Sequence, residues 1–83
     1  MESKEKKLLL DVEQGKECIV YRVNGQGGFR HRVMEMGFVR GEKVKVIKSA
    51  PLQDPIEYKI MQSHVSLRRT EAAHIEVVDV DEL

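Results

Sequence analysis

Short segments of alternating or β-branched residues recur along this chain, and they constrain its fold more than any other feature. Lys43–Val46, Ile56–Ile60 and His64–Arg68 alternate polar with apolar side chains, as is typical of strands with one buried and one solvated face. The β-branched segments Glu17–Val23 and Ile75–Val80 complete the set. Several short strands at spacings of about ten residues predict a mainly β fold, in which five or six short strands form a small, partly closed barrel.

One α-helix is predicted after the first of these strands. Phe29, Val33 and Met36 are spaced as i, i+4 and i+7, which places them on one face of a helix. Gly37 supplies the left-handed residue that commonly ends a helix. The preceding segment Gly25–Gly28 lacks the lysine and hydroxyl residue of a nucleotide-binding P-loop. We therefore expect a glycine-rich strand-to-helix turn here and no GTPase activity.

Length and charge exclude several classes of protein. The 83 residues carry 14 Lys+Arg and 14 Asp+Glu, so the formal net charge is zero. A chain of this length builds one small core, which favours binding at an outer surface over a deep substrate pocket. We expect a single domain over residues 1–83, with an ordered core at about 8–80 between a flexible start and a flexible acidic end.

Cysteine content and hydropathy predict a cytoplasmic protein. The one cysteine, Cys18, lies in an apolar run and is expected to be a buried, inert thiol. A single cysteine forms no internal disulfide, as is typical of the reducing cytosol. The apolar run near the start, Leu8–Leu10, is far shorter than a signal peptide or a membrane span. Contact with a membrane is therefore expected only through a partner.

The zero net charge hides a separation of charge along the chain. Residues 22–48 contain seven basic and two acidic residues, whereas residues 71–83 contain five acidic residues and no lysine or arginine. The basic stretch suits an acidic protein surface, anionic lipid headgroups or nucleic acid, and Arg30, Arg32 and Met34 on the helix are candidate partner contacts. Solvation of the outer strand faces is the alternative explanation for the lysines.

The aromatic residues argue against nucleic acid as a partner. RNA binding on a barrel needs exposed aromatic platforms on which bases stack. Spacing predicts that the aromatic residues of this chain lie mostly in the core; they are Tyr21, Phe29, Phe38 and Tyr58. Nucleic acid is therefore not expected as a partner.

The loop at residues 50–56 is a second candidate contact surface. Pro51 and Pro55 stiffen it, and Asp54 is expected to hold an Asx-type turn. Leu52 at its tip has no core-facing register. Because a rigid loop loses little chain entropy on binding, Pro51 and Leu52 are candidate partner contacts. A purely structural hairpin loop is an equal alternative, since isolated surface leucines are common.

Candidate ligands and capping residues are few. His31 and Glu35 lie four residues apart on one helical face and are candidates for weak binding of Fe²⁺ or Zn²⁺. An ordinary solvated pair explains them better, since no third ligand is evident. No serine, histidine and carboxylate stand at the spacing of a catalytic set, so we expect neither an enzyme nor a required cofactor. Thr70 is expected to cap a short turn of helix before the last strand.

Three segments resemble the FeoA family in their order and residues: Met36–Gly41, Ala50–Ile56 and Val65–Ala72. The resemblance extends from Leu8 to Val78. It implies an SH3-like barrel and a role as a cytosolic accessory of bacterial ferrous iron uptake. The implied partner is FeoB, a membrane iron transporter with a cytosolic GTPase domain. The resemblance implies no activity in this chain itself.

Two positions depart from the family pattern. Gln53 stands where the family usually has glycine in a Pro-Leu-Gly-Asp-Pro loop, and Gln62 with Ser63 replaces a glycine-containing hairpin turn. The alternative to a transporter accessory is a stand-alone regulatory barrel that binds a transition metal or nucleic acid. Weak homo-oligomerisation is also left open by the sequence.

Overall fold

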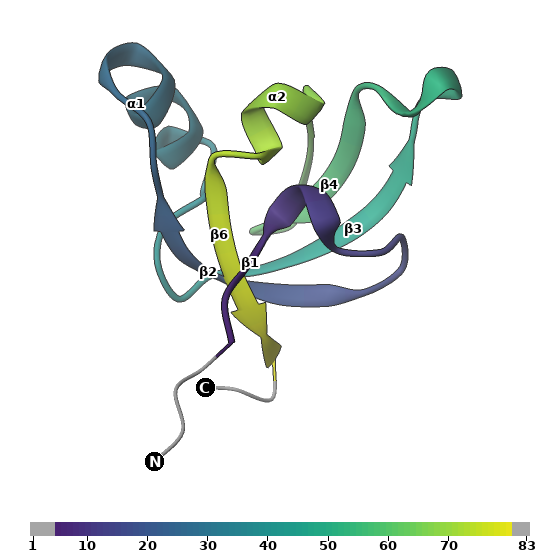
Figure 1. The fold of residues 1–83 in the computed structure, drawn as a ribbon, viewed down its shortest axis with the longest axis horizontal. Coiled ribbons are helices and arrows are strands. Elements are labelled where there is room, and N and C mark those ends of the chain that lie inside the picture. The colour runs from purple at the N-terminus through teal and green to yellow at the C-terminus, as the bar shows by residue number, and fades with distance from the viewer. Residues whose placement is uncertain (1–4, 81–83) are drawn as a thin grey trace.

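The computed structural model describes residues 5–80, which form one antiparallel sheet of six strands with two helices at one end (Figure 1). Across the sheet the strands follow the order β1-β6-β2-β3-β4-β5. The strands are β1 (Lys7–Leu8), β2 (Glu17–Val23), β3 (Lys43–Ser49), β4 (Ile56–Ile60), β5 (Ser63–Leu67) and β6 (Ile75–Asp79). The predicted mainly β fold is confirmed, and all five predicted strands are present.

The helical elements agree with the sequence pattern in position. They are α1 (Gly27–Glu35), α2 (Arg69–Ala72) and two 3₁₀ segments, η1 (Leu9–Asp11) and η2 (Pro51–Gln53). The helix predicted after the first strand is α1, which follows β2 because a sixth strand, β1, precedes it. Strand β1 pairs two residues with β6 and is too short to show alternation.

Two irregularities bend the sheet around its core. The register of β2 against β6 shifts between Val20 and Arg22, and the register of β3 against β4 shifts between Val46 and Lys48. An extra residue on one strand of an antiparallel pair bends that strand and increases its twist. Strands β2 and β3 therefore curve around the interior instead of lying flat (Figure 1).

The core is aliphatic around two aromatic rings. Phe38 and Tyr58 are fully buried, and their rings meet edge to face with centroids 6.3 Å apart. Within residues 5–80 the Tyr58 hydroxyl has no hydrogen-bond partner, and burial raises the pKa of this phenol. The aliphatic side chains packed with them include Leu9, Val20, Val33, Val44, Ile60, Leu67, Ile75 and Val77.

Helix α1 ends at the glycine that the sequence predicted. Gly37 has a φ of 116°, and the next N–H, of Phe38, donates to the carbonyl of Val33 over 3.1 Å. A Cβ atom at position 37 would lie 2.8 Å from the sulfur of Met61. Glycine is therefore required here both for the left-handed conformation and for close approach to the β4–β5 turn.

The turn between β4 and β5 keeps a conformation that usually needs glycine. Its central residues, Met61 and Gln62, have φ values of 52° and 67°, while the flanking Ile60 and Ser63 pair with each other. Positive φ at both central residues characterises the type I′ hairpin turn, whose twist matches that of the strands. A left-handed conformation costs a residue with a Cβ atom about 1 kcal/mol, so the paired strands impose this turn on the sequence.

We predict that Gln62→Gly raises the free energy of unfolding by about 0.5–1 kcal/mol, because glycine adopts positive φ without a steric penalty. Chemical denaturation measures the change. The matched control is Ser63→Gly, one residue further into β5, which is expected to lower stability by about 0.5–1 kcal/mol because glycine weakens a strand. Destabilisation by both substitutions would contradict this account of the turn.

Candidate functional site

The sequence-predicted contact residues lie at one end of the molecule, on two sides of α2 (Figure 1). Arg30, Arg32 and Met34 belong to α1, whereas Pro51 and Leu52 belong to η2 at the far side. Helix α2 lies between these two elements, as Figure 1 shows. The fold thus brings the candidates to a common end but not into a single cluster.

Leu52 presents its side chain to solvent from a backbone in an unusual conformation. The residue is 95% exposed and has a φ of 71°, and the following residue, Gln53, has a φ of 65°. The loop is closed by backbone bonds: the N–H of Ala50 donates to the carbonyl of Pro55 over 2.9 Å, and the N–H of Gln53 donates to Ala50 over 2.7 Å. The tip is therefore held by the loop's own backbone.

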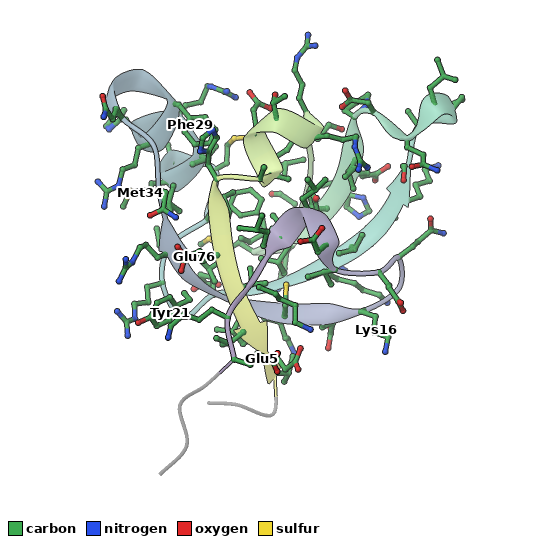
Figure 2. The ribbon with its side chains drawn as sticks, in the orientation of Figure 1. Glu5, Lys16, Tyr21, Phe29, Met34 and Glu76 are labelled. Carbon is green, nitrogen blue, oxygen red and sulfur yellow. The ribbon has the colours of Figure 1, made fainter. Side chains whose placement is uncertain are left out.

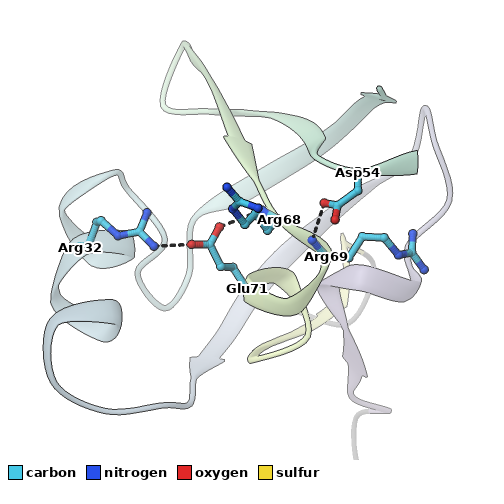
Figure 3. A network of polar contacts seen from close by, with 5 residues as sticks. All are labelled: Arg32, Asp54, Arg68, Arg69 and Glu71. Atoms are coloured by element: carbon cyan, nitrogen blue, oxygen red, sulfur yellow. Dashed lines mark hydrogen bonds and ion pairs between the residues drawn. The ribbon is translucent and has the colours of Figure 1, made fainter. Parts of the chain in front are cut away.

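The local turn predicted for Asp54 was wrong, because its side chain bonds a residue much further along the chain. Asp54 does not hold an Asx-type turn: its Oδ1 accepts a hydrogen bond from the backbone N–H of Arg69 over 3.0 Å (Figure 3). Arg69 is the first residue of α2 and lies 15 positions further along the chain. This bond anchors the base of the Leu52 loop to the start of α2.

The cap predicted for α2 was also wrong. Thr70 lies inside the helix, and Arg68 occupies the N-cap position. The side chain that serves the helix start is Glu71, whose Oε1 accepts a hydrogen bond from the N–H of Arg68 over 2.8 Å. A glutamate at the third helical position is the signal that could have identified this residue, since it is half of a capping box.

Glu71 also binds the neighbouring helix. Its Oε2 accepts a hydrogen bond from the guanidinium of Arg32, which forms an ion pair with it (Figure 3). Together, the Arg32–Glu71 and Asp54–Arg69 contacts connect α1, α2 and the Leu52 loop. We call this set the α2 clip. It fixes the position of the exposed loop relative to α1.

The other two candidate contact residues on α1, Arg30 and Met34, differ in whether their side chains are already engaged within the molecule. The Nε of Arg30 donates to the carbonyl of Val23 over 3.2 Å, which connects the helix back to the end of β2. Met34 is 36% exposed and lies on the outer side of α1 (Figure 2). Arg30 and Arg32 therefore have structural contacts, and Met34 is the most accessible apolar residue of this helix.

The charge separation seen along the sequence is not a separation in space. Strand β6, in the acidic segment, pairs with β2, and Glu76 lies opposite Arg22. Oε2 of Glu76 accepts a hydrogen bond from Nδ2 of Asn24 over 2.7 Å. The acidic segment thus packs against the basic one, because antiparallel pairing brings the last strand beside the first long one.

The two candidate metal ligands, His31 and Glu35, contact each other, and no third ligand joins them among residues 5–80. Nε2 of His31 lies 3.0 Å from Oε2 of Glu35, and both side chains are exposed. Among residues 5–80, no group of three or more histidine, cysteine or carboxylate side chains is placed to hold a metal ion. A transition-metal site normally has three or four protein ligands, so these residues do not fit a resident metal.

Cys18 is buried, as predicted. Burial raises the pKa of its thiol to about 12, so the thiol stays protonated at neutral pH. Within residues 5–80, no helix is long and apolar enough to span a membrane.

The six strands and the helices at one end of them form a small SH3-like barrel domain. The model of the FeoA domain family matches residues 7–79. A curated relative, the Fe(2+) transport protein A/Fe(2+) transporter FeoB fusion protein of Porphyromonas gingivalis (strain ATCC BAA-308 / W83), is 49% identical over 69 residues. This match covers 83% of the present chain but only 8% of the relative. The chain belongs to the FeoA family.

Solved structures agree with this assignment. The solution structure of FeoA from Chlorobium tepidum is 36% identical, with a TM-score of 0.84 over 89% of this chain and 70% of that one. FeoA of Stenotrophomonas maltophilia, crystallised with zinc and described as an SH3 domain protein, is 25% identical, with a TM-score of 0.76 over 92% of this chain and 93% of that one. The expected SH3-like fold is therefore confirmed.

We predict that Glu71→Gln lowers the free energy of unfolding by about 1 kcal/mol at neutral pH, because the charge that serves the helix start and Arg32 is lost. The backbone hydrogen bond from Arg68, and secondarily Arg32, lowers the pKa of Glu71. Because folding lowers the pKa of Glu71, its contribution to the free energy of unfolding is fully present above the usual carboxyl pKa. That contribution is lost as the pH falls through the lowered pKa.

Denaturation curves of the two proteins across pH measure the difference. The difference in free energy of unfolding between the unsubstituted protein and Glu71→Gln should narrow below about pH 4. Glu35→Gln, which removes an exposed carboxylate from α1, is the matched control and should change stability by less than about 0.5 kcal/mol. An effect of Glu71→Gln that is equal at pH 3 and pH 7 would show that the charge is not involved.

Proposed function

We propose that this protein binds the cytosolic region of an FeoB-type membrane iron transporter and modulates ferrous iron uptake. The relative from Porphyromonas gingivalis, in which transport protein A and the transporter form one chain, supports this proposal. A fusion holds its two parts at high effective concentration, which favours partners that act in contact. The present domain acts from the cytoplasmic side, and GTP hydrolysis belongs to the transporter.

The observation that carries the proposal is the backbone conformation of Leu52 together with the exposure of its side chain. A leucine at a φ of 71° bears a backbone penalty of about 1 kcal/mol, and at 95% exposure it gains no burial in return. Packing within residues 5–80 therefore does not explain a leucine at this position. A partner that covered the side chain would recover about 1.5–3 kcal/mol.

The surroundings of Leu52 suit a docking element. The backbone bonds of the loop and the Asp54–Arg69 contact hold the tip before a partner arrives. Binding by a preformed loop loses little conformational entropy. Through the α2 clip, Met34 on α1 is held in a constant relation to the same end of the molecule and extends the proposed contact surface.

We predict that Leu52→Asp weakens binding to the purified cytosolic domain of the transporter at least about tenfold, because a charge replaces the apolar contact. Met61→Asp is the matched control. Met61 is also an exposed apolar residue with positive φ, 60% exposed, but it follows the other end of β4. Met61→Asp should change the affinity for the cytosolic domain of the transporter by less than about twofold. Calorimetry measures both affinities.

A second variant separates folding from contact. Leu52→Gly removes the backbone penalty and should raise the free energy of unfolding by about 1 kcal/mol while binding is still lost. Unchanged affinity in both Leu52 variants would overturn the assignment of this loop. Absence of binding by the unsubstituted protein, with and without GTP, would overturn the proposed partner.

We further propose that this role needs no resident metal, because His31 and Glu35 supply only two exposed ligands. Titration with Zn²⁺ or Fe²⁺ in a calorimeter should give a Kd weaker than about 100 µM. Treatment with a chelator should leave both the melting temperature and transporter binding unchanged. A stoichiometric site with micromolar affinity that His31→Gln abolishes would overturn this part of the proposal.

A further inference from the structure

Tyr21 lies at the surface, although its spacing predicted a core residue. It sits where β2 shifts register against β6: Val20 pairs with Val77, Arg22 pairs with Glu76, and Tyr21 is left between them. Cys18 and Val20 belong to the core, so the alternation of a strand places Tyr21 with Ile19 on the outer face, and the extra residue of the bulge then returns Val23 to the core. The ring of Tyr21 is half-buried and lies on the outer side of the sheet (Figure 2).

Three cations from separate segments converge on this ring. The Nζ of Lys6 lies 4.8 Å from the ring centroid, and the guanidinium carbons of Arg40 and Arg22 lie 4.6 Å and 5.5 Å from it. Each cation is attracted to the aromatic ring, but the three positive charges repel one another. We call these four residues the Tyr21 cluster.

The cations of the Tyr21 cluster have no carboxylate partner among residues 5–80. None of the three forms an ion pair there, although other cations of the molecule do: Lys7 pairs with Asp79 over 3.1 Å, and Arg32 pairs with Glu71. The positive charge that gathers around Tyr21 is therefore left for an anion from outside the described chain.

The cluster borders a cleft of about 350 Å³ with an apolar floor. Ile19 and Val78, which pair across β2 and β6, line it together with Gly41, Lys6 and Arg40. Both apolar residues are buried but lie apart from the main core cluster. No carboxylate of residues 5–80 lines this cleft. The cleft therefore combines space for an apolar side chain with a rim of positive charge.

The backbone holds Arg40 beside this cleft. The N–H of Gly41 donates to the carbonyl of Val20 over 2.9 Å, and the N–H of Val20 donates to the carbonyl of Glu42 over 2.9 Å. These bonds tie the turn that carries Arg40 to β2 next to the bulge. The guanidinium and the ring are thus positioned by the fold before any ligand binds.

We propose that the Tyr21 cluster binds an acidic segment of a partner protein. One carboxylate pairs with the guanidinium of Arg40, Lys6 and Arg22 add positive potential, and a neighbouring apolar side chain of the partner enters the cleft. Arginine suits this role because its planar guanidinium can donate two parallel hydrogen bonds to a carboxylate. The Tyr21 cluster is then a second contact surface beyond the Leu52 loop, and its binding can be tested without the transporter.

A membrane surface fits these observations less well than an acidic protein segment. Binding to anionic lipid normally involves about four to eight lysines and arginines on one surface. The Tyr21 cluster holds three cations, fewer than that. The site is also a cleft with a defined apolar floor, which matches a side chain better than a layer of headgroups.

A peptide titration followed by ¹H–¹⁵N NMR tests the proposal. The probe is an acetylated and amidated Glu-Glu-Leu-Glu-Glu peptide at an ionic strength of about 20 mM. We expect saturable shifts of the amide signals of Tyr21, Arg40 and Gly41, with a Kd below about 1 mM. The same peptide with Gln in place of Glu should produce none.

Variants of equal charge change make the test specific. Arg40→Gln should weaken peptide binding at least fivefold, whereas Lys45→Gln, at an exposed position on β3, should change it less than twofold. Equal effects of the two substitutions would show nonspecific attraction and overturn the proposal. So would the absence of shifts at a peptide concentration of about 5 mM. Binding through Tyr21 to phosphatidylglycerol vesicles but not to the peptide would assign the surface to lipid instead.

Discussion

Strand β2 pairs with β6 on one side and with β3 on the other, and the positions of Tyr21 and of helix α1 depend on that double pairing. It brings Glu76 of the acidic last strand opposite Arg22, at the start of the basic stretch 22–48. Tyr21 lies with Ile19 on the outer face of β2, beside the register shift, and three cations meet its ring. Its end leads through a glycine-rich turn into α1, and the Arg30 side chain ties that helix back to the strand.

Glu71 connects helix α1 to helix α2 at the end of the molecule where the Leu52 loop lies. One carboxylate serves the start of α2 and pairs with Arg32 of α1, while the same short helix binds Asp54 through a backbone N–H. These contacts hold the exposed Leu52 and helix α1 in a constant relation at this end of the molecule.

Much of the fold could be predicted from the sequence, because strand and helix periodicity are local. Alternation identified three of the strands closely, β-branched runs identified two more, and Gly37 identified the end of α1. The two-residue strand β1 could not be found, since no alternation shows in so short a segment. Asp54 and Thr70 were assigned local capping roles, but the structure uses a contact across 15 residues and a glutamate instead.

The sequence by itself determined the class of fold, the absence of a large interior and the family, because those follow from periodicity, length and local motifs. Only the tertiary structure decided which charges of residues 5–80 form ion pairs with one another and which do not. Residues 22–48 and 71–83 carry opposite charge in the sequence, yet pairing of β2 with β6 places parts of both side by side. Likewise, the core contacts of Cys18 and Val20 place Tyr21 on the outer face of β2, half-buried, and the bulge then returns Val23 to the core, because a shift of a single residue reverses the face that a strand residue occupies.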